Sequence, residues 1–457
     1  MEEGKIHKKL GKHVDVIVHR GAREIGGTII EVRDRDESII LDMGISYAKR
    51  NMYYGFPFRK PEDISELLQL GITPHVKGLY TEWQDGEPIG YPTDIRGVII
   101  THAHTDHIGL VTQVNRDIPV YLGETAKHIL DVMMAMRQSK KRDNINGVRF
   151  ETFRTGREIR FEDIKVIPIH VDHSIPGSYS LIVETSEGVI LYTGDYRLHG
   201  KASSLTMDMV NIAADMGIDL MFTEGTRVFN VNMIREDDVQ TNLKELFSMF
   251  NGEVLLEKSY TDFDRLLSIL TAAGSTGRKV LMVHRHAIYL MFYIMEDKIL
   301  SKKIRDVIDE YSLEIGVYIP GERVRLEFMD KGTTINKEGV VEKAEKLGFN
   351  PYHEYRYDSK TVVIGIEKIL KEATIKQKGN KLMIFSTSEP VDEESEIEHE
   401  RILNWMGHAG IPTYRLHCSG HITPMDNKKV VREIKPRQLE VVHSKNPDVL
   451  KKFILGG

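Results

Sequence analysis

The chain has 457 residues, of which 41% are hydrophobic and 28% charged, so it can bury large cores and is not an intrinsically disordered protein. Its formal net charge of −6 excludes a uniformly cationic nucleic-acid-binding protein, but it does not exclude a local basic groove. The single cysteine, Cys418, excludes an intrachain disulfide framework and a zinc site built from thiolates alone.

The first residues contain no apolar segment of the kind found in signal peptides. The longest apolar run, residues 287–295, is too short to cross a bilayer. We therefore expect a cytoplasmic protein that does not enter a membrane.

Residues 1–225 show the pattern of a β-rich domain with inserted helices. Short β-rich runs at 14–19, 28–32 and 38–41 are separated by glycines and acidic turns. A Tyr-, Gly- and Pro-rich stretch follows at 51–94, with an expected helix at 61–70 and no role that the sequence assigns. A buried strand is then predicted at 96–100 and a helix at 108–114. Further strands are expected at 119–121, 165–169, 179–184, 189–192 and 219–222.

The pattern changes after residue 225. Strand-like runs at 255–256, 279–283 and 381–385 alternate with helical patterns at 262–273, 287–295 and 394–405. This alternation is typical of a parallel α/β domain. From about residue 411 the chain returns to short strands, at 413–416 and 439–442.

The strongest chemical signal is a run of three histidines and one aspartate directly after the predicted strand at 96–100: His102, His104, Asp106 and His107. Side chains alternate along an extended chain, so His102 and His104 point to the same side. Asp106 and His107 come from the turn that opens a helix. Imidazoles and carboxylates suit borderline metals such as zinc, and two neighbouring ligand sets predict two metals rather than one. The alternative is a chance cluster among the 19 histidines, but the ordered pattern after a buried strand argues against it.

This motif resembles the signature of the metallo-β-lactamase superfamily, and further motifs match in the same order. Asp42 resembles the aspartate that braces the histidine loop, and His173 resembles the ligand of the third motif. Asp195, in a Gly-Asp pair after a strand, resembles the carboxylate that bridges two metals. The resemblance implies an α/β fold of the metallo-β-lactamase αββα sandwich type.

Within the superfamily, the chain is similar to the β-CASP nucleases, and among these to the ribonucleases J. Glu224, His421 and His443 match motifs A, B and C of that branch, and the glycine-rich residues 21–27 resemble the first turn of ribonuclease J. The resemblance implies a metallo-β-lactamase domain over 1–225, an inserted α/β β-CASP domain over 226–410, and a return segment over 411–457. The resemblance is to the shorter, archaeal form of ribonuclease J, which lacks the extra C-terminal domain of the bacterial enzymes.

The family resemblance also implies roles for the site residues. Two zinc ions per chain are expected, with manganese as the other metal considered, and Asp195 shared between them. One ion is assigned to His102, His104 and His173, and the other to Asp106, His107 and His443. The catalytic residues are expected to be Asp42, Asp195, Glu224 and His421, of which the last is the general acid for the leaving 3′-oxygen, held by Glu224. The alternative is that Glu224 caps a turn and His421 only donates to a phosphate.

Hydroxyls and backbone N–H groups in turns after strands can cradle phosphates. The substrate-binding residues expected on this basis, and from the family, are Ser386, Ser388, His417 and Ser419. Ordinary loop chemistry is the alternative at each position.

The resemblance predicts a zinc-dependent 5′→3′ exoribonuclease of RNA decay and processing, acting on single-stranded RNA and preferring 5′-monophosphate ends. A homodimer is expected. The nearest alternative is a β-CASP endoribonuclease of the pre-mRNA 3′-end cleavage type. A glyoxalase-type ester hydrolase would need no large insertion, and a non-catalytic RNA-binding subunit would not need an intact ligand set.

Overall fold

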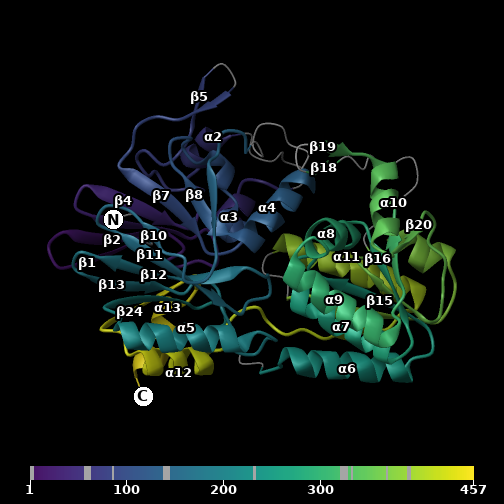
Figure 1. The fold of residues 1–457 in the computed structure, drawn as a ribbon. Helices are drawn as coiled ribbons and strands as arrows, with labels where there is room; N and C mark the ends of the chain where they lie inside the picture. The colour runs from purple at the N-terminus through teal and green to yellow at the C-terminus, as the bar shows by residue number, and fades with distance from the viewer. Residues whose placement is uncertain are drawn as a thin grey trace. The chain divides into compact units, whose positions relative to one another are not determined.

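The computed structural model describes residues 5–55, 63–84, 87–136, 145–229, 233–319, 328–330, 333–366, 369–388 and 393–456. The chain forms two compact units (Figure 1). The first unit contains Met1–Leu130, Arg137–Met233 and Gly420–Gly457, and the second contains Asp131–Met136 and Ile234–Ser419. The second unit is therefore inserted into the chain of the first.

The limits of this insertion differ from those expected from the sequence, which are residues 226 and 410. The second unit runs on to Ser419 because β23 (Thr413–Arg415) pairs in parallel with β22 (Lys381–Ser386) and so extends the sheet of the second unit. That pairing joins segments distant in sequence, and a three-residue strand does not reveal it.

The first unit contains two large sheets. The seven-stranded sheet has the order β1-β2-β3-β4-β7-β8-β9. Its strands are β1 (Ile6–Leu10), β2 (Val14–Arg20), β3 (Ile29–Asp34), β4 (Glu37–Leu41), β7 (Ile95–Ile100), β8 (Val120–Gly123) and β9 (Phe150–Phe153). β1 to β4 are antiparallel neighbours, whereas β4, β7, β8 and β9 run parallel.

The six-stranded sheet has the order β10-β11-β12-β13-β14-β24. It consists of β10 (Ile159–Arg160), β11 (Lys165–Val171), β12 (Ser178–Thr185), β13 (Gly188–Tyr192), β14 (Leu220–Glu224) and β24 (Gln438–Val442). β13, β14 and β24 are parallel, and β11 runs in the same direction because β11 and β13 are both antiparallel to β12. The carboxyl ends of these four strands therefore lie at one edge of the sheet.

The core of the first unit lies between the two sheets. Alternate residues of each strand point to the same face, so Val16 and Val18 of β2 pack in one cluster with Leu181 and Val183 of β12. The other face of the six-stranded sheet is covered by α5 (Ser203–Met216), α12 (Pro424–Ile434) and α13 (Pro447–Leu455), as Figure 1 shows. Two packed sheets with helices outside confirm the predicted fold class.

The helix expected at 108–114 is wrong in its bounds. The structure instead has a short α3 (Thr105–Ile108), followed by a 3₁₀ turn at Val111–Gln113. α4 (Glu124–Met136) follows β8 directly.

The stretch at 51–94, to which the sequence assigns no role, contains α2 (Ile64–Gln69) and the hairpin of β5 (Glu82–Gln84) and β6 (Glu87–Ile89). It is preceded by α1 (Tyr47–Asn51). α2 lies inside the helix expected at 61–70, of which residues 61 and 62 are outside the described part of the chain.

The second unit has a parallel sheet in the order β20-β17-β16-β21-β15-β22-β23, with helices in most of the connections between its strands. Its other strands are β15 (Glu253–Lys258), β16 (Lys279–Val283), β17 (Ile315–Tyr318), β20 (Asn350–Tyr352) and β21 (Thr361–Ile364), and a separate hairpin joins β18 (Phe328–Asp330) to β19 (Thr333–Ile335). The helices are α6 (Glu236–Met249), α7 (Phe263–Ser275), α8 (Arg285–Tyr289), α9 (Lys298–Tyr311), α10 (Lys337–Lys346) and α11 (Glu393–Ala409), with π-helical turns at Leu290–Ile294 and Glu372–Lys376. Within the described residues of both units, no helix is long and apolar enough to cross a membrane.

Candidate metal centre

The predicted histidine loop follows β7 in the first unit. His102 and His104 lie on the extended segment after the strand, and His104 directly precedes α3, which carries Asp106 and His107. His102 and His107 are buried, whereas His104 and Asp106 are partly exposed. A strand end and a helix start thus present four metal-binding side chains at one place.

Three further side chains reach this loop from the carboxyl edge of the six-stranded sheet. His173 follows β11, Asp195 follows β13 and His443 follows β24. Because these strands run in the same direction, residues distant in sequence meet at that edge. The structure therefore brings together all seven residues that were assigned to metals.

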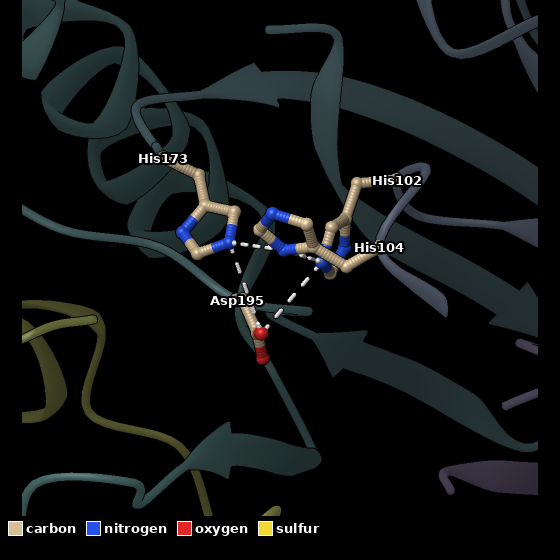
Figure 2. Close-up of side chains that lie close together, drawn as sticks. All are labelled: His102, His104, His173 and Asp195. Carbon is tan, nitrogen blue, oxygen red and sulfur yellow. Dashed lines mark hydrogen bonds and ion pairs between the residues drawn. The ribbon is translucent and has the colours of Figure 1, made fainter. Parts of the chain in front are cut away.

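The first ligand group consists of His102, His104, His173 and Asp195, one atom of each lying within 4.8 Å of the others. His104 Nδ1 lies 3.1 Å from both His102 Nε2 and His173 Nε2 (Figure 2). Asp195 Oδ2 lies 3.7 Å from His102 Nε2 and 3.9 Å from His173 Nε2. Three ring nitrogens and a carboxylate oxygen converge on one point, which is the donor set of a tetrahedral metal site.

The second ligand group consists of Asp106, His107 and His443. Asp106 Oδ2 lies 3.1 Å from His443 Nε2 and 4.0 Å from His107 Nε2. Asp195 faces this group as well, with Oδ2 at 3.3 Å from His107 Nε2 and Oδ1 at 3.7 Å from His443 Nδ1. The carboxylate of Asp195 thus lies between the two groups.

Two buried atoms of this cluster show that the residues fit a cation. Among the described residues, neither His107 Nε2 nor Asp195 Oδ1 makes a hydrogen bond of acceptable geometry, although His107 Nε2 lies 3.3 Å from Asp195 Oδ2. Buried polar atoms without partners are costly, and a bound metal ion would satisfy both. The donors also match those that zinc prefers, namely imidazole nitrogen and carboxylate oxygen.

Asp42 holds the histidine loop in place through hydrogen bonds. It accepts hydrogen bonds from the Thr101 N–H at 2.7 Å, from His107 Nδ1 at 2.7 Å and from the Tyr192 hydroxyl at 2.8 Å. The bond at Nδ1 directs His107 Nε2 toward Asp195, because the two ring nitrogens point in opposite directions. Asp42 has a positive φ of 62°, a conformation that aspartate tolerates better than most residues.

The glycines near the N-terminus make room for Asp106. A Cβ on Gly26 would lie 2.6 Å from the Asp106 Cβ, and a Cβ on Gly44 would lie 1.7 Å from the Asp106 carbonyl oxygen. The Gly27 N–H donates to that same carbonyl oxygen at 3.0 Å. Glycine at these positions allows the backbone to approach α3 closely.

The pKa of His107 in the second ligand group is shifted in the opposite direction from those of the three histidines in the first. Burial lowers the pKa of His102 and His173 well below the usual value, and that of His104 to about 4, so these rings are neutral as metal ligands must be. Burial acts in the same direction on His107, but the carboxylates of Asp195, Asp42 and Asp106 outweigh it and raise the pKa of His107. These carboxylates therefore attract a positive charge at the second ligand group, which can be a proton on His107 or a metal ion bound by its neutral ring.

Glu224 and His421 form a pair beside the two groups. His421 Nδ1 lies 3.1 Å from both oxygens of Glu224 and 3.7 Å from Asp195 Oδ2. Burial would lower the pKa of His421, but the charges of Glu224 and then of Asp195 raise it to about 9. Glu224 is buried and also accepts the backbone N–H groups of Tyr196 and Ile422, so its position is fixed.

The four predicted phosphate-binding residues belong to the second unit. Ser386 is buried, and its hydroxyl donates to the Leu416 carbonyl at 2.6 Å and accepts from Arg265 at 2.6 Å. Burial, followed by the charge of Arg265, lowers the pKa of His417 to about 3. Ser388 is exposed and Ser419 is partly exposed. Phosphate binding by all four stays a prediction, and for Ser386 this geometry favours a structural role.

Sequence reasoning missed the residues that hold these side chains in place, notably Thr101, Tyr192 and Arg265. Arg265 is fully buried and donates to both oxygens of Glu236 at 2.9 Å. A search for metal ligands does not find such residues, because tyrosine, threonine and arginine are not typical ligands and their partners lie far away in sequence.

Comparisons with known proteins agree with this geometry. A family model described as a beta-lactamase superfamily domain matches residues 78–284. The ribonuclease J 2 of Staphylococcus saprophyticus is 26% identical over 286 residues, a match that covers 61% of this chain and 46% of the relative. The ribonuclease J 2 of Staphylococcus aureus is 25% identical over 285 residues, with the same shares. The match thus spans less than half the length of these relatives.

A solved structure shows the fold over nearly the whole chain. The crystal structure of a protein of unknown function from Enterococcus faecalis V583 superposes with a TM-score of 0.71 and 21% identity, covering 96% of each chain. The matches confirm the resemblance to ribonuclease J, and the superfamily match together with the His/Asp cluster indicates a metal site.

Proposed function

From its resemblance to the ribonucleases J and its match to a beta-lactamase superfamily domain, we propose that the chain is a hydrolytic nuclease that cleaves RNA. More specifically, we propose a zinc-dependent 5′→3′ exoribonuclease that prefers 5′-monophosphate ends of single-stranded RNA. The observation that carries the proposal is the pair of ligand groups around Asp195, with the protonated His421 next to them.

We assign one zinc ion to the first ligand group and a second to the second ligand group, with Asp195 shared; manganese is the alternative metal. When bound, the two ions supply a hydroxide nucleophile at neutral pH and positive charge for the scissile phosphate. Asp195 faces both groups and Asp42 fixes His107, so these residues would hold the two ions at one place.

His421 supplies the proton for the leaving 3′-oxygen. Its Nδ1 is hydrogen-bonded to Glu224, so the proton to be transferred is on Nε2. With a pKa of about 9 the ring is protonated at neutral pH, and Glu224 stabilises the charged form. As the proton leaves, the ring becomes neutral and Glu224 keeps it in place for the next cycle.

The 5′→3′ direction and the preference for a monophosphate rest on the resemblance to ribonuclease J. A terminal monophosphate can be bound by a few hydroxyl and N–H donors, whereas a triphosphate is bulkier and more highly charged. Ser388, His417 and Ser419 are the residues we propose for such contacts. A homodimer, a cytoplasmic location and a role in RNA decay and processing belong to the same proposal.

The test uses RNA labelled at its 3′ end, with either a monophosphate or a triphosphate at the 5′ end. We expect a ladder of progressively shorter labelled products, formed faster from the monophosphate. A labelled 5′ end should be released as mononucleotide. A single internal cut that ignores the 5′ end would instead identify an endoribonuclease of the 3′-end cleavage type.

A further inference from the structure

A buried ion pair joins the two loops that carry His173 and Asp195. Arg197 Nε donates to Asp172 Oδ1 at 3.0 Å, and the Arg197 backbone N–H donates to the Asp172 carbonyl at 2.9 Å. Both side chains are essentially inaccessible to solvent. Asp172 directly precedes His173, and Arg197 follows Asp195 by two residues. The pair therefore links the backbones of two ligand-bearing loops by two directional hydrogen bonds.

Helix α5 adds a third connection. The Asp172 backbone N–H donates to the Thr206 hydroxyl at 3.0 Å, and that hydroxyl donates to the Arg197 carbonyl at 2.9 Å. Thr206 is fully buried, and its one hydroxyl thus joins both loops to the helix. Gly200 packs directly against this ion pair, because a Cβ there would lie 2.3 Å from Arg197 Nε and 2.4 Å from Asp172 Oδ2.

The ring of His173 needs this support, because its own hydrogen bond fixes only its rotation. His173 Nδ1 donates to the Gly420 carbonyl at 2.6 Å, which directs Nε2 toward the first ligand group. The 3.9 Å separation of His173 Nε2 from Asp195 Oδ2 depends on where the two backbones lie. Asp172, Arg197 and Thr206 link these two backbones to each other and to α5 by hydrogen bonds.

Stability alone does not account for such a pair. Removing an arginine and an aspartate from water is expensive, and well-packed apolar residues in place of a buried ion pair are often as stabilising or more so. Apolar side chains, however, do not fix a distance between two loops as directional hydrogen bonds do. The main contribution of the ion pair is therefore to fix the distance between the two loops, rather than to add stability.

We propose that Asp172, Arg197 and Thr206 are positioning residues that set the separation of His173 from Asp195 and thereby the metal affinity of the first ligand group. This inference rests on the proposed two-metal site. Residues that orient metal ligands typically contribute about 10- to 100-fold to metal affinity, and we expect a loss of that size when the link is removed.

The test is a zinc titration of purified full-length protein against a chromophoric chelator, which measures affinity without activity. The main variant is Asp172→Asn/Arg197→Met, which removes both charges of the pair together. Thr206→Val, an almost isosteric change, serves as a second variant should the first not fold. His173→Ala and His443→Ala identify which phase of the titration belongs to which ligand group.

The control is a buried hydrogen-bonded pair of the second unit, in which the Tyr355 hydroxyl donates to the carboxylate of Glu253. The variant Glu253→Gln/Tyr355→Phe removes that pair. We expect this control to keep both zinc affinities. The Asp172→Asn/Arg197→Met variant should lose about 10- to 100-fold in the phase that His173→Ala abolishes, with a smaller change in the other phase. Thr206→Val should weaken the same phase by less.

The outcomes separate this inference from the proposed function. If wild-type protein binds fewer than two zinc ions, the two-metal proposal fails, whatever the variants do. If wild type binds two ions and folded Asp172→Asn/Arg197→Met and Thr206→Val proteins bind both with wild-type affinity, the positioning role is wrong. An equal loss in the control variant would also contradict it, since the effect would then be one of general destabilisation.

Discussion

His421 illustrates how a single residue acquires a chemical task from its neighbours. Its side chain is 22% exposed, whereas Glu224 and Asp195 beside it are almost fully buried. Two carboxylates held away from water raise its pKa to about 9 in spite of the opposing effect of burial. The ring is therefore charged and still accessible, which is what a proton donor to a substrate oxygen requires.

Replacing His421 with alanine should slow RNA cleavage by roughly 10²- to 10⁴-fold, the usual contribution of a positioned general acid. Metal content should not change, because the metals are assigned to other residues. Single-turnover cleavage and elemental analysis of the same sample measure both quantities. Cleavage at the wild-type rate would show that the leaving oxygen obtains its proton elsewhere.

Glu224→Gln should change the pH dependence of cleavage rather than abolish it. The charge of Glu224 raises the pKa of His421 above the ordinary histidine value, so the protonated acid persists to higher pH than it would without that charge. With glutamine, the decline on the alkaline side should begin at lower pH, closer to the ordinary histidine value of about 6.5. A pH–rate profile of both proteins tests this, and an alkaline limb that does not move would contradict the role of Glu224.

Among single residues, the sequence predicted the metal ligands better than the residues that hold functional side chains in place. His102, His104 and Asp106 are identifiable because they stand in one short motif after an apolar strand. Arg265 could not be identified, because its partners Glu236 and Ser386 are distant in sequence and meet it only in the folded chain. For the same reason the sequence did not show that the Ser386 hydroxyl is already engaged.

The elements that build the metal centre are strand ends. Parallel strands place residues of separate segments at one edge, so β11, β13 and β24 of the six-stranded sheet and β7 of the other sheet deliver the ligands, and β14 delivers Glu224. Apolar runs followed by polar residues made these strands predictable. The helix expected at 108–114 was misplaced because α3 begins at Thr105, inside the histidine motif, and ends after one turn.

Gly44→Ala tests how closely α3 must approach the neighbouring backbone. The added Cβ would overlap the Asp106 carbonyl oxygen, which belongs to backbone and cannot rotate away. We expect a loss of stability of about 1–3 kcal/mol or more and weaker metal binding by the second ligand group, because α3 must shift. Thermal unfolding and zinc titration measure the two effects.

Gly407→Ala is a suitable control for that variant, since a Cβ at Gly407 meets no atom within 4 Å and the residue lies in α11. Alanine in an accommodating helix position usually stabilises slightly. The interpretation of Gly44 would be wrong if both variants retained wild-type stability and metal content.

At the scale of the whole molecule, the chain carries a net charge of −6 and is nevertheless proposed to bind a polyanion. Binding then depends on local phosphate contacts, each of which releases counterions from the nucleic acid. We therefore expect the Kd of His421→Ala for single-stranded RNA to rise steeply between 50 and 200 mM salt, on a log–log plot with a constant slope. Fluorescence anisotropy provides the measurement, and an affinity independent of salt would exclude binding through phosphates.

The most direct test of the account is the metal content of the purified protein, combined with RNA cleavage before and after chelation. The two ligand groups predict two zinc or manganese ions per chain, loss of cleavage when they are removed, and recovery when either metal is added back. Cleavage of single-stranded RNA by metal-free protein, or at most one tightly bound ion in the active protein, would contradict it.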